Sequence, residues 1–372
     1  MPNKNKKILL FIIGLIAFAL LVKAVSVGYK FFPFLFELTF KHNIELKQQD
    51  DQINILLLGI SGGEHDGPNL TDTIIFASIN PKLNKVGLIS LPRDLWAPDI
   101  KNKINVAYAE GESKRKGGGL VLAEAVVSKI LKKDIDYGLR IDFNGFVKAV
   151  DLLNGLDIDV EKNFDDYEYP IEGKENDLCG HEEEELGELA TASSQLEAFP
   201  CRYKHLHFDK GVQYMDGEKA LEYVRSRHAI GSEGSDFARS RRQEKIIKAF
   251  KDKIFSLQFL ANPGKLFNLY SIVRESIDTD IKDTEFDDFV RLLEKVKEAK
   301  IQNSIIDIGD EKTKREGLLI NPELSEEYDY QWVLIPRLGN GNFTEIQKYT
   351  DCELKVGNCT ILKLTKEEFD KY

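Results

Sequence analysis

The sequence lacks a long block of lysine and arginine, and its charge balance is acidic. Its 372 residues include 51 lysines and arginines against 62 aspartates and glutamates, which gives a formal net charge of -11. Surfaces that bind nucleic acid carry clustered basic residues, so nucleic acid is not an expected partner. Much of the excess acid is local, because residues 165–200 hold twelve acidic residues and one lysine, Lys174. This stretch is predicted to be a solvated insertion.

Cysteine is scarce, and no C-x-x-C pair is present. The four cysteines are Cys179, Cys201, Cys352 and Cys359. The first two flank the acidic insertion and the last two close a short loop, so local pairing, 179 with 201 and 352 with 359, is the simplest of three connectivities.

A zinc site at the first cysteine pair is the alternative, because three histidines lie nearby in the sequence: His181, His205 and His207. Structural disulfides on the oxidising side of a membrane are the interpretation that the spacing favours.

One long apolar run is present, near the N-terminus. Lysines at 4, 6 and 7 precede an uncharged run from Ile8 to Val22, and the apolar character continues past Lys23 to Tyr29. This is about the ~20 residues needed to span a bilayer, with the lysines on the cytoplasmic side. We therefore expect a tail and transmembrane anchor over 1–30, a linker over 31–52 and an extracytoplasmic body. The alternative is a signal peptide cleaved after "AVS" at 24–26, which also exports the body.

The body has 42% hydrophobic and 30% charged residues, which excludes a disordered or fibrous chain. Strand-like runs at 53–59, 73–80 and 86–91 are followed by helical patterns at 119–131 and 144–153, with strands at 137–142 and 156–160 between and after them. Four longer helices are expected at 216–223, 235–253, 263–276 and 284–299. The order predicts an α/β fold, a mixed central sheet flanked by helices, over residues 53–300.

From about residue 301 the pattern changes to short strands and turns. We expect residues 301–372 to form a small β-rich C-terminal extension. The alternative is that these strands complete the main sheet.

Charged residues at two strand ends are candidate site residues. Asp72 stands at the mouth of a strand, where a carboxylate binds a cation or caps a loop. Arg93 and Asp94 follow a strand that ends at Pro92, which places the guanidinium at a sheet edge where ligands bind; a surface ion pair is the alternative.

The segment "GEKALEYVRSRHAIGSEGSDFARSRRQEKIIKAF" is the most informative. Arg225 and Arg227 share one face only if the chain is extended there, so a helix should end near Val224. Ser235 can cap the next helix, on which Arg239, Arg242 and Gln243 should share a face. Such dense arginines fit a polyanion such as pyrophosphate. The alternative is a solvated helix with salt bridges to acidic neighbours, namely Glu218, Glu222 and Glu244.

Seven blocks, in order over residues 53–255, carry a family resemblance: "NILLLG", "TDTIIFASINP", "GLISLPRDLW", "KINVAYAEG", "RIDFNGFVKAVDLLNGLDIDV", "MDGEKALEYVRSRH" and "SDFARSRRQ". The chain resembles the LytR-CpsA-Psr family. The resemblance implies a membrane-anchored, extracytoplasmic α/β phosphotransferase. Such an enzyme moves a glycopolymer from an undecaprenyl (polyprenyl) pyrophosphate carrier to peptidoglycan, forms a phosphodiester in cell-wall assembly and uses Mg²⁺.

The matching motifs imply roles for individual residues. Five would bind the pyrophosphate and act in transfer: Arg93, Arg225, Arg227, Arg239 and Gln243. Asp94 and Asp236 would support them, and Asp72 would ligate Mg²⁺. These roles agree with phosphoryl transfer, which depends on positioning and on neutralising the phosphate oxygens.

The first loop departs from the family pattern Gly-x-Asp-x-Arg. In "GISGGEHDG", Ser61 and Gly63 occupy the acid and arginine positions. Asp66 is therefore a second candidate for the metal, and His65 is another way to fill the same space.

An apolar groove for the lipid is also implied. Phe143, Phe146, Val147 and Val150 are candidates, but an amphipathic helix packed on a sheet gives the same pattern, and we expect core packing. Two rival functions share the site: a polyprenyl-pyrophosphate pyrophosphatase, in which water replaces the acceptor, and a non-catalytic envelope anchor that binds wall polymer or lipid carrier.

Overall fold

The structure is a computed structural model that describes residues 44–63, 67–182, 184, 194–254, 256, 263–310 and 314–362. The expected membrane-spanning segment, residues 8–29, lies outside them. Among the residues that are described, no helix combines the length and the apolar character needed to cross a bilayer. The chain divides into two compact units, Lys47–Asp280 with Val296–Tyr372, and Met1–Leu46 with Ile281–Lys295.

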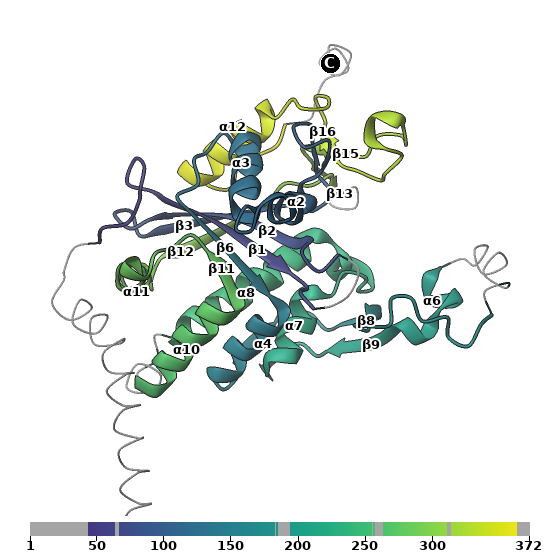
Figure 1. Ribbon diagram of the computed structural model, residues 1–372, viewed down its shortest axis with the longest axis horizontal. Coiled ribbons are helices and arrows are strands. Elements are labelled where there is room, and N and C mark those ends of the chain that lie inside the picture. Colours follow the sequence, from purple (N-terminus) through teal and green to yellow (C-terminus); the bar gives the residue numbers. More distant parts are fainter. Residues whose placement is uncertain are drawn as a thin grey trace, which may run out of the picture. The chain divides into compact units, whose positions relative to one another are not determined.

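A six-stranded mixed sheet forms the centre of the larger unit (Figure 1). Its order is β11 (Ile277–Thr279), β6 (Tyr137–Asp142), β1 (Ile53–Ile60), β2 (Thr71–Asn80), β3 (Lys85–Leu91) and β12 (Lys300–Ile305). Strands β1, β2 and β3 form an antiparallel meander, while β6 and β12 pair in parallel with β1 and β3. The predicted α/β class with a mixed central sheet is confirmed.

One face of the sheet packs on α2 (Ala107–Lys114), α3 (Gly119–Leu131) and α12 (Thr344–Lys355). Alternate residues of the central strands, including Leu56, Phe76 and Ile89, are buried there with the apolar stripe of α3. Because helices also lie over the other face, these strands are near-continuous apolar runs rather than strict alternations (Figure 1).

Four helices lie on the opposite side of the sheet (Figure 1). They are α4 (Phe143–Leu152), α7 (Gly217–Arg225), α8 (Asp236–Ile254) and α10 (Pro263–Ser276). Helix α4 contacts α7 and α10, and α7 contacts α8. A second core, which includes Val150, Met215 and Tyr223, joins these helices to the hairpin of β7 (Leu156–Val160) and β10 (Gly211–Met215). The helices expected at 119–131 and 263–276 have the bounds that the sequence predicts.

A second antiparallel pair, β8 (Phe164–Pro170) and β9 (Tyr203–Phe208), begins the acidic insertion and extends from the body (Figure 1). The insertion carries α6 (Gln195–Ala198) and the disulfide Cys179–Cys201, with an S–S distance of 2.13 Å. Cys352 and Cys359 form the other disulfide, so the structure has the local pairing expected from the sequence. Since both sulfurs of the first pair are oxidised, the zinc alternative loses its thiolate ligands.

The segment after residue 300 differs from the extension expected there. Strand β12 is an edge strand of the main sheet, and α12 packs on α3 and β3. Two short antiparallel pairs complete this region: β13 (Gly309–Asp310) with β14 (Arg315–Glu316), and β15 (Leu319–Ile320) with β16 (Ile335–Pro336). The boundary expected at 300 is thereby corrected, because Leu318, Leu334 and Ile346 belong to the same core as the sheet.

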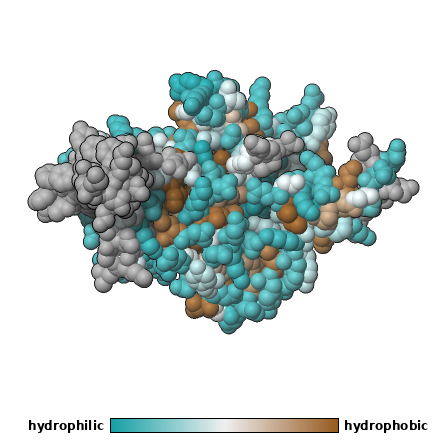
Figure 2. All heavy atoms as spheres, turned by 60° about the horizontal axis from the view of Figure 1, so that its bottom comes forward, coloured by the Kyte–Doolittle hydropathy of each residue, from teal (hydrophilic) through white to brown (hydrophobic). Residues whose placement is uncertain are grey.

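Short elements complete the description. In the larger unit they are β4 (Trp96–Ala97) paired with β5 (Asn102–Lys103), and the 3-10 turns η1 (Ile104–Val106), η3 (Pro200–Arg202), η4 (Gly231–Gly234) and η6 (Glu326–Tyr328). The described part of the smaller unit holds η5 (Asp283–Glu285) and α11 (Phe286–Lys295), so the helix expected at 284–299 is shorter than predicted. On the face that Figure 2 shows, hydrophilic side chains predominate and apolar ones form small separate groups.

Candidate functional site

A cavity of about 390 Å³ lies in the larger unit, between the helix-covered second face of the sheet and helices α4, α7 and α8. Its sheet-side wall is apolar and includes Leu57, Ile75 and Leu139. Apolar residues from the helices, including Leu221 and Ile247, form the opposite wall. The volume falls in the range of ~300–1,000 Å³ typical of small-molecule sites.

The polar end of the cavity brings together residues that are far apart in the sequence. Six of the residues assigned by resemblance line it: Asp72, Arg93, Arg225, Arg227, Arg239 and Gln243. They come from β2, the turn after β3, the end of α7, the segment after it, and α8. The site therefore combines a cationic rim with an apolar interior.

Asp72 and Arg93 form an ion pair at this rim. Arg93 Nη1 lies 2.5 Å from Asp72 Oδ1, and Arg93 Nε lies 3.4 Å from Asp94 Oδ2. Burial alone would lower the pKa of Arg93, but the ion pairs and hydrogen bonds with both aspartates outweigh it, and the pKa lies above its usual value. Asp94 is also bound by Lys103 Nζ at 2.9 Å, which agrees with a supporting role.

Arg225 is the last residue of α7, and its guanidinium group is clamped between two aromatic rings. The guanidinium carbon lies 4.1 Å from the centroid of Phe143 and 5.4 Å from that of Tyr169. Arg225 Nη1 also donates to the Tyr169 hydroxyl at 3.2 Å. Burial raises the pKa of Tyr169 to about 12, against the opposing effect of Arg225, so the hydroxyl stays protonated. Glu222, one of the acids in the salt-bridge alternative, is paired with Lys204 at 2.5 Å.

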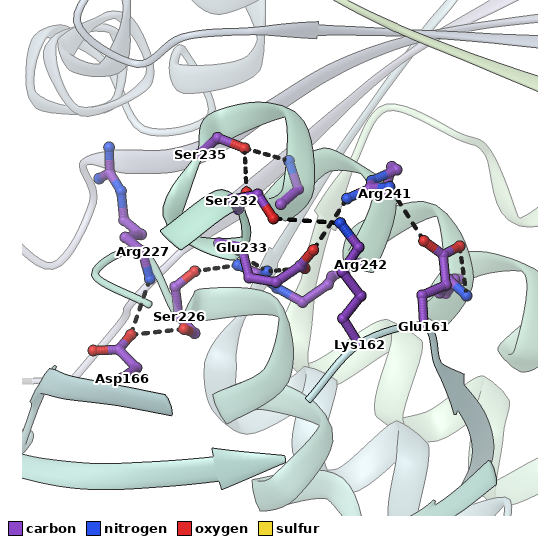
Figure 3. A network of polar contacts seen from close by, with 12 residues as sticks. Glu161, Lys162, Asp166, Ser226, Arg227, Ser232, Glu233, Ser235, Arg241 and Arg242 are labelled. Carbon is purple, nitrogen blue, oxygen red and sulfur yellow. Dashed lines mark hydrogen bonds and ion pairs between the residues drawn. The ribbon is translucent and has the colours of Figure 1, made fainter. Parts of the chain in front are cut away.

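Arg227 lies two residues on, in the segment that follows α7. Its backbone N–H donates to Asp166 Oδ2 at 3.2 Å, and the same oxygen accepts from the Ser226 hydroxyl at 2.6 Å. Figure 3 shows the Arg227 side chain extending away from Asp166.

Helix α8 supplies Arg239 and Gln243. Its start is fixed as predicted, because the Ser235 hydroxyl accepts from Ala238 N at 3.2 Å. Gln243 Nε2 donates to the Thr73 hydroxyl at 3.3 Å, which ties the helix to β2. The expectation that Arg242 shares this face is wrong. Arg242 is 2% exposed and donates to the carbonyls of Ser226 and Glu233. Because three residues fall short of a full helical turn and four exceed it, Arg242 and Gln243 lie on opposite sides of Arg239, and Arg242 faces the second core.

Three predicted residues fall wholly or partly outside the described residues. Asp66 and His65 are among residues 64–66 of the first loop, which lie outside them, so both stay predictions. Asp236 is the first residue of α8, and its side chain is not described. Of the groove candidates, Phe143 and Phe146 line the cavity, whereas Val150 is fully buried in the second core.

Two carboxylates in the cavity lining, those of Asp72 and Asp142, are of the ligand type that a magnesium ion takes. Asp142 lines the same cavity as Asp72, from the end of β6. Asp142 Oδ1 accepts from Gly145 N at 2.7 Å to cap α4, and Oδ2 lies 3.3 Å from Arg140 Nη1. Mg²⁺ is commonly held by one or two carboxylates with phosphate oxygens and water, which is the donor set available here.

Sequence reasoning missed Tyr169 and Asp166, which lie in the stretch predicted to be solvated. The register of β8 shifts between Asp166 and Tyr169, so the two-residue period of a strand does not mark both side chains as buried. Asp166 is 1% exposed, so it is part of the interior.

The blocks that carry the arginines and Asp72 belong to a larger match: the profile of the LytR_cpsA_psr family matches residues 36–325. The chain belongs to the LytR-CpsA-Psr family. The match covers the cavity lining and all six strands of the central sheet, including β12.

Curated members of the LytR-CpsA-Psr family show what the chain is similar to. The polyisoprenyl-teichoic acid–peptidoglycan teichoic acid transferase TagV of Bacillus subtilis is 28% identical over 75% of this chain and 66% of its own length, slightly under two thirds. The polyisoprenyl-teichoic acid–peptidoglycan teichoic acid transferase TagU of Bacillus cereus is 25% identical over 76% of this chain and 82% of its own length.

Two solved structures share the fold. The crystal structure of TagV from B. subtilis is similar with a TM-score of 0.52 and 23% identity, over 82% of this chain and 98% of that one. Protein gbs0355 from Streptococcus agalactiae gives a TM-score of 0.54 and 21% identity, over 86% and 95%.

Proposed function

We propose that the protein is a phosphotransferase that moves a glycopolymer from a polyprenyl pyrophosphate carrier to peptidoglycan. The observation that carries the proposal is a single cavity with four arginines at its rim and an apolar interior. A polyprenyl pyrophosphate has the complementary shape, an apolar chain that ends in a polyanion. The relatives' names add the reaction class, transfer of teichoic acid from a polyisoprenyl carrier to peptidoglycan.

In the proposed reaction, a hydroxyl oxygen of the acceptor sugar attacks the phosphorus that carries the glycopolymer. The new P–O bond forms as the bond to the bridging oxygen breaks, the polyprenyl phosphate leaves with that electron pair, and the hydroxyl proton passes to solvent. Arg93, Arg225 and Arg239 would neutralise the charge on the non-bridging oxygens. The Phe143–Tyr169 clamp would hold one of these guanidinium groups in place before the carrier arrives.

Asp72 would hold a Mg²⁺ ion at the rim, with Asp142 as a second carboxylate. When bound, the ion would polarise the pyrophosphate oxygens and neutralise part of their charge. Asp72 would then exchange its contact with Arg93 for the cation, which would leave that guanidinium available to phosphate.

We also propose that the body works outside the cytoplasm, anchored by the apolar segment near the N-terminus. The lipid carrier is a membrane molecule, and the two disulfides fit an oxidising compartment.

The test is a reconstituted reaction with the full-length protein, Mg²⁺, a labelled polyprenyl-pyrophosphate oligosaccharide and peptidoglycan. We expect polyprenyl monophosphate release together with label on the peptidoglycan. Arg239→Ala should lower the rate by about 10²-fold or more, whereas Arg202→Ala, on the acidic insertion, should not. Release of oligosaccharide phosphate without attachment would identify a pyrophosphatase, and an uncleaved carrier would support a non-catalytic anchor.

A further inference from the structure

The segment that carries Arg227 depends on side chains for its hydrogen bonds. It leaves α7 at Ser226, whose backbone is extended with φ -53° and ψ 126°. Backbone N–H groups in such a segment need acceptors when they are removed from water. Asp166 Oδ2 is the acceptor for three donors: Ser226 Oγ at 2.6 Å, Arg227 N at 3.2 Å and His228 N at 3.3 Å. Figure 3 shows the contacts with Ser226 and Arg227.

The other oxygen of Asp166 ties the carboxylate to its own strand. Oδ1 accepts from Glu168 N at 3.0 Å, and Asp166 forms an isolated β-bridge with Ala229. Asp166 thus joins β8 to the whole segment 226–229, through its carboxylate at residues 226–228 and through its backbone at Ala229. Its position is fixed by the strand, and the segment's position is fixed by the carboxylate.

A buried arginine holds the opposite side of the same segment. Arg242 Nη2 donates to the Ser226 carbonyl at 2.6 Å, and Arg242 Nη1 donates to the Glu233 carbonyl at 2.9 Å (Figure 3). Ser226 is fully buried between Asp166 and Arg242. Since its hydroxyl and its carbonyl are both bonded, the backbone that leads to Arg227 has little freedom to rotate.

The negative charge of Asp166 has a cost at this position. A carboxylate in the lining of a cavity that binds pyrophosphate repels the ligand, more strongly in a partly dry site than in water. A neutral asparagine could accept some of the same bonds. The anion binds its backbone donors more strongly, because charged acceptors make shorter and stronger hydrogen bonds.

We infer that Asp166 is a positioning residue: it fixes the main chain of Ser226, Arg227 and His228 and thereby directs the Arg227 guanidinium group to the pyrophosphate. The inference rests on the proposed function for its ligand. The hydrogen bonds between Asp166 and the segment do not depend on the proposed function, so these bonds and the effect on ligand binding are tested separately.

The first experiment needs no ligand. Hydrogen exchange of the full-length protein is followed by mass spectrometry for the peptide that covers residues 226–229. Asp166→Asn should speed exchange there by about tenfold, since it weakens charge-assisted bonds. The matched control is Asp165→Asn, the neighbouring residue, which bonds His205 and His207 and should leave this peptide unchanged. Unchanged exchange in Asp166→Asn would overturn the inference.

The second experiment asks whether Asp166 acts through Arg227. The affinity for geranylgeranyl pyrophosphate is measured for wild type, Asp166→Asn, Arg227→Ala and the double variant. We expect Asp166→Asn to weaken binding about tenfold in wild type but less than about twofold in the Arg227→Ala background. Equal losses in both backgrounds would mean a merely structural role and would overturn the inference.

Two further outcomes are informative. If Asp166→Asn does not fold, Ser226→Ala removes one donor only and should give a smaller loss with the same dependence on Arg227. If wild type does not bind the probe, the proposed function fails, and the exchange experiment alone decides whether Asp166 fixes the segment.

Discussion

Replacement of Arg225 by lysine tests whether the aromatic clamp prepares the site for pyrophosphate. Lysine keeps the charge but loses the flat guanidinium group, its stacking on Phe143 and its donation to the Tyr169 hydroxyl. A partly buried cation–π contact contributes about 1–2 kcal/mol and the hydrogen bond about 1 kcal/mol. We therefore expect a loss of about 2–3 kcal/mol in binding, which is roughly 30- to 150-fold in Kd.

The assay is calorimetric titration of the full-length protein with geranylgeranyl pyrophosphate. Tyr169→Phe removes only the hydroxyl group and should account for about fivefold of the loss. Arg202→Lys is the matched control, because Arg202 stacks on Phe199 at 3.7 Å in the acidic insertion, away from the cavity lining. A Kd for Arg225→Lys within twofold of wild type would refute the argument that the clamp contributes to binding.

Three further predictions concern stability and metal. Burial, with Asp280 nearby, raises the pKa of Glu124 from 4.5 to about 7. Between these two pH values the folded protein binds a proton on Glu124 that the unfolded chain has released. The free energy of unfolding therefore falls as the pH rises through this range. Glu124→Gln should stabilise the protein at pH 8 by about 1–2 kcal/mol, after allowance for solvent screening, and less at pH 5, as thermal unfolding would show. Replacing Cys352 and Cys359 by serine should cost about 2–3 kcal/mol of unfolding free energy from loop entropy, measured by denaturant titration. Chelation of divalent metal should stop transfer, and Ser61→Asp should lower the Mg²⁺ concentration for half-maximal transfer; indifference to both would remove the metal from the mechanism.

The sequence was sufficient for the four central strands of the sheet and for most bounds of the helices that it predicted, because local signals there agree with the tertiary structure. Strand β1 is a short apolar run bounded by turn residues, and α8 begins where Ser235 provides a cap. The arginines of the cavity were also predictable, since their density in an acidic protein has few structural explanations.

Other features depend on contacts that spacing does not encode. Arg239 and Arg242 are three residues apart, yet one lines the cavity and the other is buried beneath Ser226. Composition alone placed Asp166 in a solvated stretch, because a buried acid is recognised only by the donors that surround it. The edge position of β12 could not be read from the sequence either, since its partner β3 lies more than two hundred residues earlier.

That long-range pairing has a consequence for how the protein is made. The chain is synthesised from its N-terminus, so β3 is complete long before β12 emerges, and until then the edge of β3 carries unpaired backbone groups. Helix α12, which packs on the same strand, comes later still. The sheet beneath the cavity is therefore completed only after residue 305 has emerged. A chain cut at residue 300, where composition suggests a domain boundary, would expose a strand edge that favours aggregation.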